Sequence, residues 1–326
     1  MSLESDVIVD RRRIRRKLTF WRVAAAVLAI AAIVAIGVIA TPGGRGAFST
    51  AGSIARIQID GLILSDNDRV AALERLEKSS AAAVIVHINS PGGTTAGSEQ
   101  LYDALTSLKA KKPLVVVVEG LAASGGYITA IAADHIVAQQ TSLVGSIGVL
   151  FQFPNFTDLL KTVGVKVEEV KSSPLKAAPN GFEPTSPEAR AALDSLVKDS
   201  YAWFRGLVKD RRGMDDALLD KVADGRVFTG HQAVDLKLVD QLGDEKTAVA
   251  WLVAEKGVKA GLPVRDYKLA PRFGDLTFLR TAASITLDAL GFSGMARRIE
   301  QVGVAGAVDG LSLDGMLALW QPGGTN

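Results

Sequence analysis

The sequence predicts an α/β fold with a largely parallel sheet, preceded by one N-terminal transmembrane helix. Three observations lead to this prediction. An uncharged apolar run covers residues 23–40, strand-length apolar runs recur between helical patterns, and two of those runs are followed closely by paired glycines. Alternation of strands and helices favours parallel pairing, because each helix returns the chain to the edge where the next strand begins.

The run from Val23 to Ala40 predicts a membrane anchor. Its 18 residues carry no charge, and as a helix they would span about 27 Å, close to the thickness of the hydrocarbon layer. The basic cluster RRRIRRK precedes it and should stay in the cytoplasm. A cleaved signal peptide, ending near Val38 and Ala40, and a buried core helix are the alternatives. The run is longer than the apolar region of a signal peptide.

Charge and composition exclude several classes of function. The 326 residues carry a net charge of +2, but residues 1–22 hold seven basic and three acidic side chains. The remainder is therefore slightly acidic, which argues against nucleic acid as the main partner. Cysteine is absent, so disulfides, thiol nucleophiles and cysteine-based metal sites are excluded. We expect a basic arm at 1–22, the anchor at 23–40, and a glycine-rich linker at 41–53.

The body of the chain alternates between strand and helix patterns from residue 54 onward. The expected strands are residues 54–60, 82–88, 114–119, 135–138 and 165–171. The expected helices are residues 67–79, 95–110, 155–163 and 186–212. The last begins at Ser186-Pro187-Glu188, which supplies an N-cap, a proline at the first helical position and an early acid. Residues 54–256 form the expected main domain, and residues 257–326 an extension with helices at 276–290 and 293–301.

Three glycine-bearing segments follow or flank the strands. INSPGG (88–93) places two glycines between a strand and a helix, where free N–H groups can face an anion; a plain tight turn is the alternative. LAASGGYITA (121–130) places Ser124 where a strand passes into a helix, as a nucleophile would be, or as a simple N-cap. VGSIGV (144–149) is a glycine-flanked loop.

A nucleophilic serine needs a base. The histidines His87, His135 and His231 have no recognisable acid partner in the sequence. A lysine can serve instead if it loses its proton. The candidates are Lys161, Lys166, Lys171, Lys176 and Lys198, and the residues alone do not choose among them.

Five motifs in order resemble one known family. SPGG, ASGGYITAIAAD, GSIGV, VKSSPLK and DGRVFTGHQAVDLKLVDQLG are similar to motifs of the signal peptide peptidase A family, in its short single-unit form. The resemblance covers residues 54–256 and implies the Clp protease/crotonase-like βα superhelix. It also implies a membrane-anchored serine endopeptidase with a Ser/Lys dyad.

Carried over onto this sequence, the resemblance implies a role for each of several residues. Ser124 matches the nucleophile, Lys176 the general base, and Ser146 the serine that orients that lysine. The backbone N–H groups of Gly93 and Gly125 would form the oxyanion hole. The family's base motif has a glycine and an aspartate where this chain has Ser173 and Ala177, so Lys171 stays open as the alternative base.

The resemblance also sets expectations about partners and location. The substrates would be remnant signal peptides and similar apolar peptides, and neither a metal nor another cofactor would be needed. The chain would form a homo-oligomer whose sites are shared between protomers. It would lie in the bacterial inner membrane with a single pass, the N-terminus in the cytoplasm and the catalytic domain in the periplasm. Two alternatives are a crotonase-fold acyl-CoA enzyme and an inactive membrane scaffold of the same fold.

Overall fold

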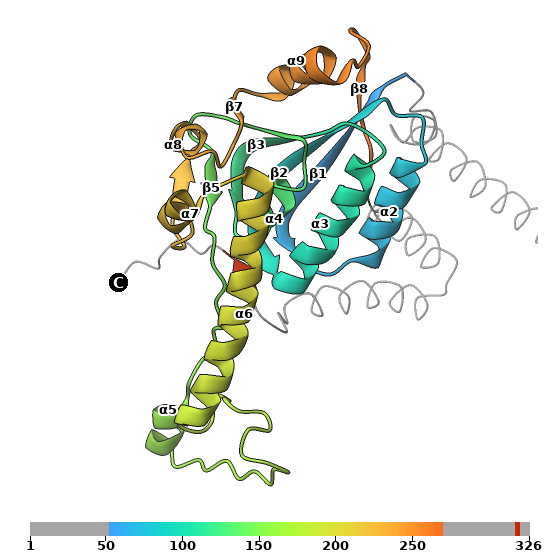
Figure 1. The fold of residues 1–326 in the computed structure, drawn as a ribbon. Helices are drawn as coiled ribbons and strands as arrows, with labels where there is room; N and C mark the ends of the chain where they lie inside the picture. The colour runs from blue at the N-terminus through green and yellow to red at the C-terminus, as the bar shows by residue number, and fades with distance from the viewer. Residues whose placement is uncertain (1–51, 270–316, 320–326) are drawn as a thin grey trace, which may run out of the picture. The chain divides into compact units, whose positions relative to one another are not determined.

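The computed structural model describes residues 52–269 and 317–319 (Figure 1). Strand and helix alternate through the first half of this range, as the sequence predicts. These elements are β1 (Ile54–Ile63), α2 (Asn67–Glu77), β2 (Ala83–Thr94), α3 (Thr95–Lys109), β3 (Leu114–Ala123) and α4 (Gly125–Ala130). The later elements are β4 (His135–Ala138), β5 (Leu143–Gly145), α5 (Thr157–Thr162), α6 (Pro187–Arg212), α7 (Asp216–Val222), β6 (Val227–Thr229), α8 (Gly230–Asp235), β7 (Gln241–Leu242), α9 (Glu245–Lys256), β8 (Val264–Asp266) and β9 (Leu317–Leu319).

One sheet runs through the body in the order β6-β5-β3-β2-β1-β8. Most of its pairs are parallel, and β2–β9 and β5–β6 are antiparallel. The outer edge of β3 pairs first with β4 and, further along, with β5. The predicted α/β fold with a largely parallel sheet is therefore confirmed for the described part of the chain.

Helices cover both faces of the central strands, which explains the continuous apolar runs in β2 and β3. On one face Val86 and Val116 pack in a large core that includes residues of α2, α3, α4 and α6. On the other face Ile85 and Val115 pack with Leu252 of α9. Burial on both faces removes the need for an alternating pattern.

Helix α6 connects this body to an arm, which we define as residues 150–196. The cap of α6 forms as predicted, with the Ser186 hydroxyl accepting from the Ala189 N–H at 3.1 Å. The C-terminal half of the helix packs on the body through Phe204 and Val208, which are fully buried. Figure 1 shows α5 and its loop at the end of α6 that lies away from the sheet.

Two predicted elements differ from the structure. Residues 165–171 lie in the arm as exposed chain and not in a strand. Their alternating valines suggested a half-buried strand, but no described strand lies beside them to pair with. We also expected a helical extension at 257–326; the residues described there include the strands β8 and β9 and no helix. The helices expected at 276–290 and 293–301 lie outside the described residues.

The anchor predicted at 23–40 also lies outside the described residues. Within residues 52–269 and 317–319, none of the helices combines the length and the apolar character needed to cross a bilayer.

We expect Phe204→Ala to destabilise the body strongly. The ring is completely buried between α6 and the sheet core, and removing such a side chain costs about 3–5 kcal/mol. Asp199→Ala is the control on the same helix. Asp199 is exposed and lies outside the arm, so its loss should change stability by less than about 0.5 kcal/mol. Urea unfolding of each full-length variant, followed by circular dichroism, measures its free energy of unfolding. Equal losses of stability in the two variants would contradict the packing of Phe204 against the sheet.

Candidate active site

Ser124 occupies a sharp turn between β3 and α4. Its backbone has φ 55° and ψ −116°, a conformation that costs a residue with a side chain about 1–3 kcal/mol. The Ser124 N–H donates to the Gly145 carbonyl at 2.8 Å, and the Ser124 carbonyl accepts from Tyr127 and Ile128. These bonds hold the serine in its strained turn at the carboxyl end of a parallel strand.

The Ser124 hydroxyl has little to bind within the described residues. The residue is only 1% exposed, and among the described residues its hydroxyl reaches only the Gly148 carbonyl, at 3.5 Å, a long contact. The neighbouring Gly125 N–H begins α4 and is one of the free donors of a helix start. A carbonyl placed at this turn would therefore meet an unengaged hydroxyl and an unengaged N–H.

The end of β2 lies beside this turn. Ser90 pairs with Ala122 of β3, and a side chain at Gly126 would come within 2.7 Å of the Ser90 carbonyl oxygen. Gly92 has φ 108°, and a side chain on Gly93 would meet the Ile63 oxygen at 1.9 Å. The close backbone contact explains why this segment is glycine-rich. It also brings the two segments that hold Gly93 and Gly125 together.

The third glycine segment supports the same turn from the other side. Strand β5 pairs with the end of β3, and Ser146 directly follows its last residue, Gly145. Ser146 also has a positive φ, 51°, and its N–H donates to the Arg226 carbonyl at 2.8 Å. It is 7% exposed, and its hydroxyl has no hydrogen bond to any residue that the structure describes. This hydroxyl is therefore available to a group that approaches Ser124.

The two candidate bases lie in the arm. Lys176 is exposed, and its side chain makes no hydrogen bond or ion pair with the described residues. Lys171 forms ion pairs with Glu169 at 2.7 Å and Glu183 at 2.5 Å. The hydrogen bonds that Lys171 donates to Glu169 and Glu183 raise its pKa, so this amine is held in its charged form. Within a single chain, the structure brings neither lysine to Ser124.

The histidines are engaged elsewhere. His87 contacts Glu245 at 2.8 Å and Glu119 at 3.3 Å. Hydrogen bonds from Arg56, and to a lesser extent His87, lower the pKa of Glu245. His87 lies on the same face of β2 as Ile85, which is the face covered by α9, whereas α4 packs on the opposite face. His135 stacks on Trp251 with ring centroids 4.5 Å apart. Neither ring contacts Ser124.

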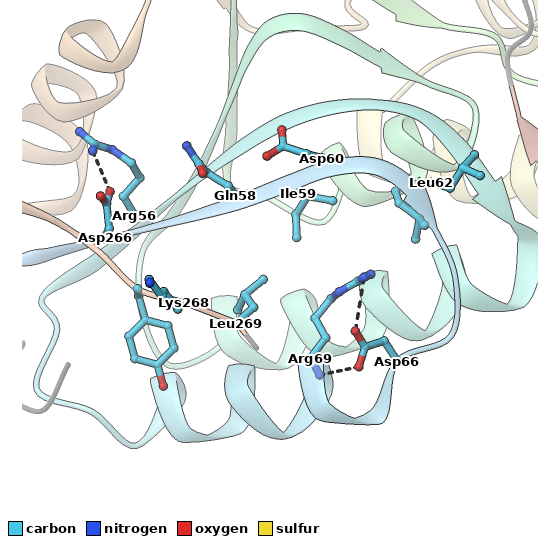
Figure 2. Close-up of a pocket in the computed structure, with 12 residues that line it drawn as sticks. Arg56, Gln58, Ile59, Asp60, Leu62, Asp66, Arg69, Asp266, Lys268 and Leu269 are labelled. Atoms are coloured by element: carbon cyan, nitrogen blue, oxygen red, sulfur yellow. Dashed lines mark hydrogen bonds and ion pairs between the residues drawn. The ribbon is translucent and has the colours of Figure 1, made fainter. Parts of the chain in front are cut away.

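A cleft of about 400 Å³ lies along β1 (Figure 2), and its lining includes Leu62 and Ile63, which pair with Gly92 and Gly93. Four of its charged side chains are paired: Arg56 with Asp266 at 2.8 Å, and Arg69 with Asp66 at 3.5 Å. None of the candidate site residues lines it. We assign it no role in the chemistry at Ser124.

Sequence reasoning missed the backbone groups that support the turn. The carbonyls of Gly145 and Arg226 hold Ser124 and Ser146 by their N–H groups, and no side-chain pattern marks a carbonyl acceptor. The glycine-flanked GSIG segment was the available signal. Its glycines permit the tight path, since Gly145 itself has φ 104°.

Comparisons with known proteins agree with this architecture. The sequence profile of peptidase family S49 matches residues 106–259, and that of the Clp protease family matches residues 63–142. The second match supports the predicted Clp protease-like fold.

Several relatives carry peptidase names. A protein of Synechocystis sp. named as a candidate protease is 37% identical over 64% of this chain and 76% of its own length. Protease 4 of Haemophilus influenzae is 30% identical over 62% of this chain, but over only 34% of its own length. An Enterococcus faecium protein, named as a candidate signal peptide peptidase SppA, is 32% identical over 56% of this chain and 54% of its own length. From the profile match and from the high coverage of the first relative, the chain belongs to peptidase family S49, which confirms the resemblance to signal peptide peptidase A.

Proposed function

We propose that this protein is a serine endopeptidase in which Ser124 attacks the peptide bond. The observation that carries the proposal is the strained turn of Ser124 beside the glycine-rich end of β2. Such a turn places the hydroxyl of a nucleophile next to free backbone donors. Membership of a peptidase family favours this reading over an acyl-CoA enzyme, and the preserved Ser124 and Lys176 favour it over an inactive scaffold.

The proposed chemistry is acyl transfer with a lysine base. Neutral Lys176 takes the hydroxyl proton of Ser124 as the serine oxygen bonds to the scissile carbonyl carbon. The N–H groups of Gly93 and Gly125 bind the resulting oxyanion; one such donor contributes about 2.7–4 kcal/mol in other enzymes. The lysine then returns the proton to the leaving amine, and water hydrolyses the acyl-enzyme by the reverse sequence. The free hydroxyl of Ser146 orients the amine of Lys176.

We propose Lys176 and not Lys171 as the base. Lys171 lies between Glu169 and Glu183, and these carboxylates stabilise the ammonium form, which cannot accept a proton. Lys176, by contrast, has no acidic partner among the described residues.

The site is completed, in our proposal, by the arm of a neighbouring protomer. Eleven large apolar side chains are exposed in the described part of the chain, and ten of them lie between residues 151 and 196. An apolar surface this concentrated marks an interface. Docking of the arm on the next copy would bury it and would carry Lys176 to the body of that copy.

The anchor and the location complete the proposal. The uncharged run at 23–40 and the basic residues before it support a single membrane pass with the body in the periplasm of a bacterial cell. A peptidase held at that surface would meet apolar peptides such as remnant signal peptides. The test of the activity is hydrolysis of an apolar peptide by the detergent-purified full chain, with Ser124→Ala as the comparison.

A further inference from the structure

A second serine, Ser90, lies buried near the end of β2 and has no part in the chemistry described so far. Its side chain is inaccessible to solvent. The Ser90 hydroxyl donates to the Gly61 carbonyl at 2.7 Å, and the same oxygen accepts from the Gly92 N–H at 3.1 Å. One side chain thus ties the end of β1 to the glycine-rich end of β2.

These two hydrogen bonds lie where the backbone of both strands is irregular. The pairing of β1 with β2 shifts its register between Asp60 and Leu62. Gly61 and Gly92 both have positive φ, 68° and 108°. A register shift interrupts the strand ladder, and glycine has more accessible conformations than any other residue. The Ser90 hydroxyl therefore supplies a constraint that the ladder does not supply here.

The peptide between Gly92 and Gly93 has a defined orientation relative to Ser90. This peptide bond is trans, so the Gly92 C=O and the Gly93 N–H point in opposite directions. The Ser90 hydroxyl oxygen lies 3.4 Å from the Gly92 carbonyl oxygen. The carbonyl end of the peptide is therefore on the side of Ser90, and the Gly93 N–H points away from it. A flip of this peptide would turn the N–H toward Ser90.

We propose that Ser90 is a positioning residue, whose hydroxyl fixes the Gly92–Gly93 peptide so that the Gly93 N–H stays directed at the oxyanion. The inference rests on the proposed function, which assigns the oxyanion to this N–H. Ser90 acts through the backbone and not on the substrate. If its hydroxyl only stabilised the fold, its loss would lower stability and would leave turnover by the folded protein unchanged.

The test compares two buried serines in the detergent-purified full chain. Ser90→Ala removes the hydroxyl and keeps the Cβ. Ser98→Ala is the matched control, because Ser98 is equally buried and its hydroxyl donates to the Thr94 carbonyl at 2.9 Å. Hydrolysis of a fluorogenic apolar peptide gives kcat and KM. Inhibition by an apolar peptide aldehyde gives a Ki, and the oxygen of its adduct with Ser124 takes the place of the oxyanion.

Ser90→Ala should lower kcat about 100-fold, the usual cost of a misplaced group in an active site. Its KM should stay within about threefold of the wild type, because the oxyanion contact forms only during the reaction. The Ki of the aldehyde should rise about 100-fold in parallel, since the adduct uses the same contact. Ser98→Ala should keep kcat within about tenfold of the wild type. A folded Ser90→Ala chain with kcat in that range, or with an unchanged Ki, would overturn the proposal.

Ser90→Cys covers the case in which Ser90→Ala does not fold. The thiol keeps the side chain in place but is a weak donor and a weak acceptor, so kcat should fall about tenfold at unchanged KM. A folded Ser90→Cys chain with the wild-type kcat would contradict the positioning role.

Amide hydrogen exchange at Gly92 separates this inference from the proposed function. Exchange should be faster in Ser90→Ala and Ser90→Cys than in the wild type, because the Gly92 N–H loses its acceptor. Unchanged exchange in both variants would show that the hydroxyl does not hold this backbone, and the inference would fail. If exchange is faster but the wild type hydrolyses no peptide, the proposed function is wrong and the catalytic role of the contact falls with it, while the hold of Ser90 on Gly92 stands.

Discussion

Ser124→Ala should lower kcat for peptide hydrolysis by at least about 10⁴-fold, because loss of a nucleophile that acts as a unit with its base removes most of the catalysis. The fold should survive, since alanine keeps the same Cβ and the turn is held by backbone bonds to Gly145, Tyr127 and Ile128. Steady-state hydrolysis of a fluorogenic apolar peptide by the full chain measures the effect.

The matched control for this prediction is Ser142→Ala. Ser142 is also a buried serine, and its hydroxyl donates to the Val118 carbonyl at 2.7 Å. Its removal should cost about 1 kcal/mol of stability and should leave kcat within about tenfold of the wild type. A Ser124→Ala chain that keeps its kcat within this range would refute the assigned nucleophile.

Lys176→Ala should reduce kcat to a floor similar to that of Ser124→Ala, because the two residues serve one proton transfer. Lys171→Ala is the matched variant five residues earlier. Glu169 and Glu183 hold Lys171 as a cation, so its loss should leave kcat within about tenfold of the wild type. Hydrolysis by the wild type should rise with pH, because only a neutral amine accepts the serine proton.

The opposite result for the two lysines would assign the base to Lys171. If folded Lys171→Ala chains lose hydrolysis while Lys176→Ala chains keep it, the base is Lys171. The two carboxylates around Lys171 would then have to separate from it when the site assembles.

The local sequence predicts the central strands and helices well and predicts the arm poorly. Runs such as residues 82–88 are buried on both faces, and no competing structure buries so many apolar side chains. The valines at 165, 167 and 170 carry a strand pattern just as clear, yet they are exposed. A strand needs a neighbouring strand, and a sequence pattern does not say whether one is there. Strand β9 is present in the structure but was not predicted, because three residues are too few to show the alternation of a strand.

The residues of the candidate site could also be predicted only in part. Ser124 could be singled out from the neighbouring sequence alone, because a serine among small residues at a strand-to-helix junction is placed as a nucleophile would be. The residue types alone do not separate Lys176 from the other lysines, since a base is defined by what lies near it; only the resemblance of VKSSPLK to a family motif singled it out. The described chain brings neither Lys176 nor Lys171 to Ser124, so under the proposed shared site the choice between them depends on contacts between protomers.

Mixing Ser124→Ala and Lys176→Ala chains tests most directly whether the serine of one protomer works with the lysine of the next. The two inactive variants are unfolded together, refolded into one oligomer in detergent, and assayed for peptide hydrolysis. If sites form head to tail between protomers, random mixing gives about one quarter of sites with both residues intact, and about one quarter of the wild-type rate. If both residues of a site belong to one chain, no mixed site is complete. An oligomer shown by mass to contain both variants, yet inactive, would contradict the shared site.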